Sequence, residues 1–190
     1  MNLYYNKNIQ CISIIKRGSK MKIAILGYSG SGKSTLAREL ASYYHNPVLH
    51  LDTVQFTPGW VERDKDEARF LTKEFMKNES WIIDGNYRGF YQQERLEQSD
   101  KIIFLNFPRR ICFFRAYKRY LNNKNKTRED MAEGCEEKFD LEFAWWILHK
   151  GRTKEIVNRY KQIEQEFKDK VVVLKNPREV SEFLADLTHN

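Results

Sequence analysis

The chain has 190 residues, 41% of them hydrophobic and 31% charged, and carries a formal net charge of +7 at pH 7. A chain of this length fits one domain and can bury a substantial core. No apolar run approaches the roughly 20 residues that a membrane-spanning helix needs, and there is no low-complexity tract. The composition therefore argues against a helical membrane protein and for a globular one.

Residues 1–20 are expected to be a disordered or atypical N-terminal extension, either an upstream addition or a native flexible arm. Their apolar stretch at residues 12–15 is too short and too late in the chain for a secretion signal. Four of the seven excess positive charges lie in this extension, which leaves +3 for residues 21–190. A surplus of that size is weak support for nucleic-acid binding. The basic residues of the extension are Lys7, Lys16, Arg17 and Lys20.

Residues 27–34, Gly-Tyr-Ser-Gly-Ser-Gly-Lys-Ser, match the phosphate-binding P-loop pattern G-x-x-x-x-G-K-[ST]. An apolar run at 22–26 predicts a strand before the loop, and apolar residues at helical spacing predict a helix over 33–44. The glycines let backbone N–H groups close around phosphate oxygens, and the helix N-terminus adds a partial positive charge. The predicted ATP-binding residues of this loop are Gly27, Ser29, Gly30, Ser31, Gly32, Lys33, Ser34 and Thr35.

Within the loop, two side chains have individual roles. Lys33 is expected to reach the β- and γ-phosphates, and the Ser34 hydroxyl is expected to hold Mg²⁺. ATP and Mg²⁺ are therefore the predicted cofactors.

Strand-like apolar runs alternate with helical patterns along the rest of the chain. Five strands that alternate with helices predict a three-layer α/β fold, with a five-stranded parallel sheet and helices on both faces. No linker divides residues 21–190 into two domains. The remaining strands are expected at 47–51, 80–84, 101–107 and 171–174, and the remaining helices at 64–77, 108–121, 139–168 and from 177 onward.

The polar segment at 122–137 is predicted to be exposed and to act as a small lid. It contains Cys135, one of three cysteines that form no C-x-x-C pair and no cysteine–histidine cluster. We interpret Cys11, Cys112 and Cys135 as reduced thiols of a cytoplasmic protein. The four histidines show no zinc-ligand spacing.

Two carboxylates come at strand ends, where ligands bind in an open parallel sheet. Asp84 ends the strand at 80–84, and Asp52 follows the strand at 47–51. Phosphoryl transfer needs a carboxylate that holds Mg²⁺, and we assign Asp84 to that site together with Ser34. Asp52 is predicted to face the phosphate acceptor, as a ligand or as a base that orients the attacking hydroxyl. Both could instead be helix caps or turn residues, which aspartate often provides.

Several arginines follow the P-loop in loops and in the polar segment. Phosphoryl-transfer sites use such cations because negative charge spreads over the γ-phosphate oxygens. Arg115 and Arg119 share one helix face, and Arg128 lies in the predicted lid. We expect at least two arginines in the site, although a single one could be a solvated surface charge. The candidates are Arg63, Arg88, Arg109, Arg110, Arg115, Arg119 and Arg128.

Aromatic residues form two groups. Phe56 and Trp60 flank a Pro-Gly turn just before Arg63, and aromatic faces beside an arginine suit a planar acceptor such as a base. The second group lies in the predicted helix over 139–168 and is expected to pack in the core. It comprises Phe143, Trp145 and Trp146.

Taken together, these motifs resemble the bacterial DNA topology modulation protein family, which is related to adenylate kinases and other small-molecule kinases. The resemblance covers residues 21 to about 187 and leaves the extension unmatched. It is carried by the segments at 25–34, 50–56, 58–60, 81–87, 126–128, 130–135 and 173–176.

The resemblance implies a nucleoside- or nucleotide-kinase-like fold with ATP and Mg²⁺ at the P-loop. It implies an acceptor-binding insertion at about 53–78 and a lid at about 122–137. It also places Arg119 and Arg128 near the lid, and Asn176 near the adenine. Adenylate kinases carry Asp-Gly-x-Pro-Arg where this chain has Asp-Gly-Asn-Tyr-Arg at 84–88, so the acceptor need not be AMP.

Two functions remain open from the sequence. The first is a small-molecule kinase that moves the γ-phosphate of ATP to a nucleotide, nucleoside or similar acceptor. In that reading Asp52, Phe56, Trp60, Arg63 and Arg88 contact the acceptor, while Lys33, Asp84, Arg119 and Arg128 act on the phosphates. The second is an ATP-dependent DNA-binding or regulatory protein, which the small core charge and the absence of a DNA-reading motif disfavour.

Overall fold

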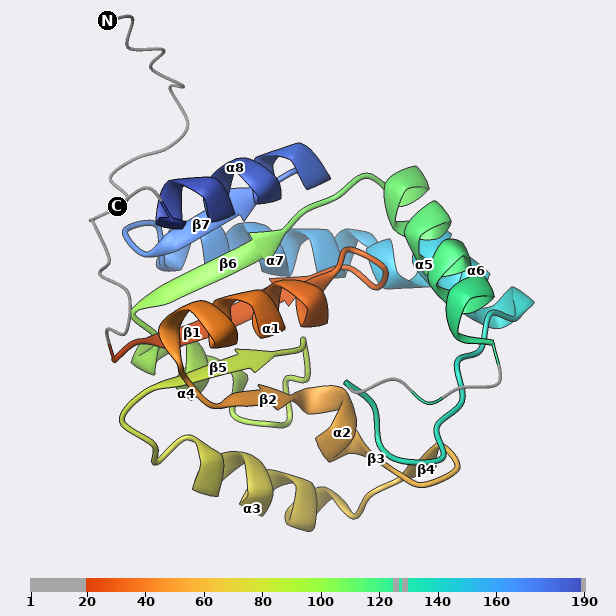
Figure 1. The fold of residues 1–190 in the computed structure, drawn as a ribbon, viewed down its shortest axis with the longest axis horizontal. Helices are drawn as coiled ribbons and strands as arrows, with labels where there is room; N and C mark the ends of the chain where they lie inside the picture. Colours follow the sequence, from red (N-terminus) through yellow and green to blue (C-terminus); the bar gives the residue numbers. More distant parts are fainter. Residues whose placement is uncertain (1–19, 125–126, 128–129, 189–190) are drawn as a thin grey trace, which may run out of the picture.

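The fold is built on a five-stranded parallel sheet with helices on both faces (Figure 1). The computed structural model describes residues 20–124, 127 and 130–188, so almost all of the predicted N-terminal extension lies outside them. The strand order is β2-β5-β1-β6-β7, and every neighbouring pair is parallel. The predicted three-layer α/β fold is confirmed. The strands are β1 (Lys22–Gly27), β2 (Val48–His50), β5 (Trp81–Asp84), β6 (Lys101–Leu105) and β7 (Val171–Leu174).

Both faces of the central strands are covered. β5 and β6 consist entirely of buried residues, and β1 is buried after its first residue. Continuous apolar runs are typical of such strands, because side chains on both faces must avoid water. In Figure 1, α1 (Lys33–Tyr44) and α8 (Pro177–Thr188) lie in front of the sheet, and α4 (Gln92–Gln98) and α7 (Lys154–Glu166) lie behind it.

The parallel register brings the chemically interesting residues to one edge of the sheet. β1 leads into the P-loop, and in the pairing of β2 with β5, His50 lies directly beside Asp84. The short helix α2 (Leu51–Gln55) follows β2 at the same edge. The P-loop, α2 and the turn after β5 therefore meet where ligands of open α/β sheets bind.

The helices at 64–77 and 108–121 are confirmed as α3 (Lys65–Phe75) and α5 (Arg109–Asn123). Asp64 caps α3, since its carboxylate accepts the backbone N–H groups of Asp66 and Glu67, both at 3.0 Å. An aspartate at this position satisfies two of the N–H groups that the first helical turn leaves without partners.

Between α2 and α3 the chain forms a small antiparallel hairpin that the sequence did not reveal. Its strands are β3 (Phe56–Thr57) and β4 (Val61–Glu62). Two residues of its turn, Gly59 and Trp60, have positive φ angles of 78° and 65°. The strands are too short to produce a recognisable alternation of apolar and polar residues.

The single helix predicted over 139–168 is wrong. The structure has α6 (Leu141–Leu148), a 3₁₀ turn at Lys150–Arg152, and then α7. Thr153 begins the second helix, because its side chain accepts the backbone N–H of Ile156 at 3.4 Å. A glycine and a threonine cap within three residues are sufficient to end one helix and begin another.

The expected core role of the aromatic cluster is also wrong for two of its members. Trp145 and Trp146 are 53% and 45% exposed, while Phe143 is partly buried and contacts Phe139. The cluster lies on α6, which packs against α5. No helix among the described residues is long and apolar enough to cross a membrane.

The Thr153 cap can be tested by stability. We expect Thr153→Ala to lower the free energy of unfolding by about 1 kcal/mol, because the first turn of α7 loses its side-chain acceptor. Thr153→Ser keeps a hydroxyl acceptor and should stay within about 0.5 kcal/mol of the native protein. Urea denaturation followed by circular dichroism measures both, and an Ala variant as stable as the Ser variant would contradict the assignment.

Candidate functional site

A large cleft of about 1360 Å³ opens at the carboxyl edge of the sheet. It is bounded by the P-loop, α2, the turn after β5, α5 and the lid segment. Most of the residues predicted from the sequence line it. They are Ser29, Gly30, Gly32, Lys33, Ser34, Thr35, Asp52, Phe56, Trp60, Arg88 and Arg119.

The P-loop has the backbone that its glycines allow. Gly30 and Gly32 have φ angles of +79° and +97°, and a Cβ on Gly30 would lie 2.3 Å from the carbonyl oxygen of Cys112. The N-cap of α1 is Gly32, and no side chain of the described residues caps this helix end. Its first-turn N–H groups, and the ammonium of Lys33, which lies 3.4 Å from the carbonyl oxygen of Tyr28, point to an anion as their natural partner.

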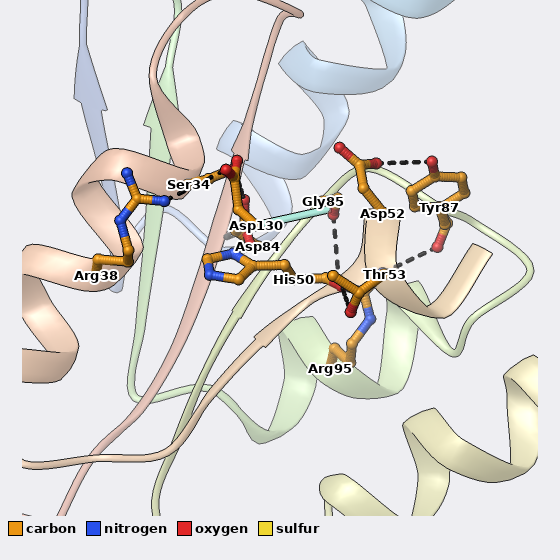
Figure 2. Close-up of polar contacts among 10 residues, drawn as sticks. All are labelled: Ser34, Arg38, His50, Asp52, Thr53, Asp84, Gly85, Tyr87, Arg95 and Asp130. Atoms are coloured by element: carbon orange, nitrogen blue, oxygen red, sulfur yellow. Dashed lines mark hydrogen bonds and ion pairs between the residues drawn. The ribbon is translucent and has the colours of Figure 1, made fainter. Parts of the chain in front are cut away.

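Beside the loop, the Asp84 carboxylate lies buried at the end of β5, only 4% exposed. Ser34 donates its hydroxyl proton to Oδ2 of Asp84 at 2.9 Å, and the ring Nδ1 of His50 lies 2.5 Å from Oδ1 (Figure 2). Hydroxyl and carboxylate oxygens are the ligands that Mg²⁺ prefers. The chemistry of this pair therefore fits a magnesium ion, and the metal role assigned to Ser34 and Asp84 from the sequence stays a prediction.

His50 is a residue of the site that the sequence reasoning missed. Burial would lower the pKa of its imidazole, but the hydrogen bond and negative charge of Asp84, with Asp130 behind it, outweigh burial and raise the pKa. The sequence feature that could have identified His50 is its position, because His50 and Asp84 end neighbouring parallel strands. Without the strand order, the sequence could not show that these two ends are adjacent.

The other carboxylate, Asp52, lies on α2 and accepts the hydroxyl proton of Tyr87 at 2.7 Å (Figure 2). Burial, together with the charge of Asp52, raises the pKa of Tyr87 well above its ordinary value, so the phenol stays a hydrogen-bond donor. Close by, the rings of Phe56 and Trp60 meet edge to face with centroids 5.3 Å apart, and Lys138 lies 5.6 Å from the Trp60 ring. This half of the cleft combines a carboxylate with aromatic surface.

Two arginines of the site form ion pairs with acidic residues. Arg119 forms two contacts with the buried carboxylate of Glu137, through Nε at 2.8 Å and Nη2 at 2.7 Å. Arg38 pairs with Asp130 at 3.4 Å, which brings the lid segment back to α1. Arg115 lies against the P-loop, since its Nη2 is 2.6 Å from where a Cβ of Gly32 would be. Arg128 lies outside the described residues.

Several predicted residues do not line the cleft. Arg109 and Arg110 are exposed on the first turn of α5, and the Asp84 carboxylate is buried. Arg63 donates from Nε to the carbonyl oxygen of Val54 at 2.9 Å, pairs with Glu67, and lines a separate open groove. Asn176 caps α8, where its Oδ1 accepts the backbone N–H of Glu179 at 3.1 Å. Gly27 and Ser31 also stay behind the cleft surface as buried parts of the loop.

A further cation, Arg152, supports the loop from behind and was not predicted. Its guanidinium carbon lies 3.6 Å from the ring centroid of Tyr28, the second residue of the P-loop. Its Nη2 donates to the carbonyl oxygen of Phe107 at 2.7 Å and contacts Sγ of Cys112 at 3.2 Å. The 3₁₀ turn that interrupts the predicted long helix is what places this arginine there.

The segment at 130–137, part of the predicted lid, is docked on the hairpin of β3 and β4. The prediction that this segment is exposed is wrong in part, because Asp130, Met131, Cys135 and Glu137 are buried. The backbone N–H of Trp60 lies 3.3 Å from Sγ of Cys135, and the indole Nε1–H donates to the carbonyl oxygen of Glu136 at 3.0 Å. The Cys135 thiol in turn lies 3.4 Å from the carbonyl oxygen of Thr57. Two segments that are more than 70 residues apart in the sequence thus meet and cover the cleft on the side of Asp52.

No protein-family model and no curated protein matches the chain. Among solved structures, the chain is similar to the shikimate kinase from Acinetobacter baumannii in complex with shikimate, with a TM-score of 0.56. The match covers 90% of this chain and 93% of that chain at 14% sequence identity. Similarity at this identity shows a shared fold and leaves activity to be argued from the site. Membership of the topology modulation family stays a prediction.

The docked lid predicts the accessibility of Cys135. In the native protein, thiol alkylation of Cys135 needs the lid to leave the hairpin, because the side chain is buried. We expect Trp60→Ala, which removes the indole hydrogen bond and the ring packing, to accelerate alkylation of Cys135 about tenfold or more. Peptide mass spectrometry measures the extent of alkylation of each cysteine separately.

Cys112 supplies the internal control, because it is a buried residue of α5 and its contacts, to Phe107 and Arg152, do not involve Trp60. Its alkylation rate should be unchanged in the Trp60→Ala variant. Equal acceleration of both cysteines would mean global destabilisation and would refute the proposed docking contact.

Proposed function

We propose that the protein is a small-molecule kinase that transfers the γ-phosphate of ATP to a hydroxyl-bearing acceptor. The observation that carries this proposal is the placement of Asp52, whose carboxylate lines the same cleft as the P-loop. An ATPase needs only the phosphate and metal side of such a cleft. A second carboxylate beside an aromatic surface gives the cleft a place for another substrate.

On the nucleotide side, the P-loop amides and Lys33 would bind the phosphates. Ser34 and Asp84 would hold Mg²⁺, which neutralises phosphate charge when bound. Arg115 lies against the loop, and Arg119 and the predicted lid residue Arg128 would stabilise charge on the transferred group. The adenine contact of Asn176 remains a proposal that its capping role on α8 does not favour.

On the acceptor side, the Asp52 carboxylate would orient the attacking hydroxyl and accept its proton. Tyr87 occupies Oδ1 of this carboxylate, so the other oxygen is the one available to an acceptor. Phe56 and Trp60 would pack against a flat part of the acceptor, and Arg88, exposed at the cleft, would bind an anionic group. Holding both substrates in this geometry supplies most of the catalysis in phosphoryl transfer.

The direct test is a phosphate-acceptor screen with labelled ATP and Mg²⁺. The panel contains nucleosides, nucleotides, small alcohols and shikimate, the compound bound to the kinase of similar fold. We expect one acceptor class to take label in the native protein and not in Lys33→Ala, which loses the phosphate-binding ammonium. Lys168→Ala, an exposed lysine far along the chain, is the matched control and should label normally. Labelling that Lys33→Ala fails to reduce would refute the proposal.

Once an acceptor has been identified, the Asp52→Asn variant tests the acceptor side of the cleft separately from the nucleotide side. We expect kcat to fall about 10²–10⁴-fold, because the amide cannot accept the proton of the attacking hydroxyl. The KM for ATP should change little, since Asp52 lies on the other half of the cleft. Asp66→Asn, an exposed aspartate of α3, is the control in steady-state kinetics. A normal kcat in Asp52→Asn would remove Asp52 from the chemical step.

A further inference from the structure

His50 lies between the two halves of the cleft and has contacts toward both (Figure 2). It is the last residue of β2 and the N-cap of α2, so its ring and its carbonyl belong to different parts of the site. Its side chain is 11% exposed, which leaves little freedom for the ring. No role for this residue follows from the P-loop motif.

We propose that His50 is a positioning residue that fixes the Asp84 carboxylate for the metal and holds α2, with Asp52, in register with it. The inference rests on the proposed kinase function, because it concerns the metal and acceptor sides of that reaction. It assigns to one residue, through its ring on Asp84 and its backbone carbonyl on Thr53, the geometric link between two carboxylates that would act on the same phosphate.

The metal side of this link is the contact between Nδ1 of His50 and Oδ1 of Asp84, at 2.5 Å. Ser34 contacts the other oxygen, so each oxygen of the carboxylate has its own donor and the plane of the group is fixed. Hydrogen bonds of this kind, from groups that do not touch the ion, set the orientation of metal ligands and strongly affect metal affinity.

The acceptor side of the link runs through the backbone. Thr53 donates its hydroxyl proton to the carbonyl oxygen of His50 at 2.7 Å, which anchors the first turn of α2. Asp52 lies between these two residues and is held from the opposite side by Tyr87. The carbonyl oxygen of Tyr87 accepts Nη2–H of the buried Arg95 at 2.9 Å, and Arg95 also donates to Gly85, the residue after Asp84. These contacts therefore connect Asp52 back to the residue that follows Asp84.

The experiment compares a side chain that keeps the donor with one that does not. His50→Asn places an amide N–H donor the same number of bonds from Cβ as Nδ1, whereas His50→Leu fills similar volume without a donor. Electron paramagnetic resonance of Mn²⁺ added to protein with ATP measures metal affinity without any acceptor. ATP binding in the presence of EDTA, by calorimetry, measures the nucleotide site alone.

We expect His50→Leu to weaken Mn²⁺ binding about 10–100-fold while ATP binding without metal changes less than about threefold. His50→Asn should recover Mn²⁺ affinity to within about threefold of the native protein. Thr53→Val is the matched control, because it removes the backbone anchor of α2 and leaves the ring contact to Asp84. Its Mn²⁺ affinity should be native. If His50→Leu does not fold, His50→Phe, which keeps a ring without a donor, replaces it.

Two failures are distinguishable. A native protein that binds no Mn²⁺ with ATP would overturn the proposed function itself. A native protein that binds Mn²⁺, with His50→Leu binding it equally well or with metal-free ATP binding lost to the same extent, would overturn only the positioning role. If either of these two results for His50→Leu were obtained, His50 would be a structural residue of the β2–β5 edge.

Discussion

The site depends on the buried carboxylate of Asp84. Removing a charged carboxylate from water costs several kcal/mol unless hydrogen bonds replace the lost solvation. Here Ser34 and His50 provide those contacts from α1 and β2, while Asp84 itself belongs to β5. One carboxylate on β5 thereby connects α1, which follows the P-loop, with β2, the strand that leads to α2. The P-loop cannot adopt a different position relative to α2 without leaving a buried charge without partners.

A buried arginine, Arg95, stabilises the same edge of the sheet. Arg95 is fully buried and donates to the backbone carbonyl oxygens of Phe90, Gly85 and Tyr87. Burial lowers the pKa of its guanidinium to about 10, although the negative charge of Asp84 acts in the opposite direction, so it stays protonated at neutral pH. The turn that follows β5 is therefore held by a charged donor, and hydrogen bonds to charged groups are stronger than those between neutral groups. This rigidity keeps the Tyr87 hydroxyl in place for Asp52.

What the sequence predicted well was local in origin. The P-loop, the five strands and the capped helices each follow from residues within about ten positions of one another, and Ser34 with Asp84 followed from strand ends and ligand chemistry. The missed contacts of the cleft join distant segments, as His50 with Asp84 and Trp60 with Cys135 do, whereas two other misses were local. Arg63 looked like an acceptor residue but is used within its own turn, by Val54 and Glu67. The break at 149–153 was local and was missed because the apolar period continues across it.

The two halves of the cleft differ in what specifies them. The P-loop of the phosphate half is one continuous motif, which Asp84 and Arg152 support from other elements. The acceptor half requires Trp60 of the hairpin, Cys135 of the lid segment and Tyr87 of the β5 turn to meet. Each of these contacts spans at least 35 residues of sequence and lies outside the P-loop motif. Under the proposed function, the identity of the acceptor would therefore depend on tertiary contacts that can change while the P-loop motif is kept, in line with the observation that one fold can host many functions.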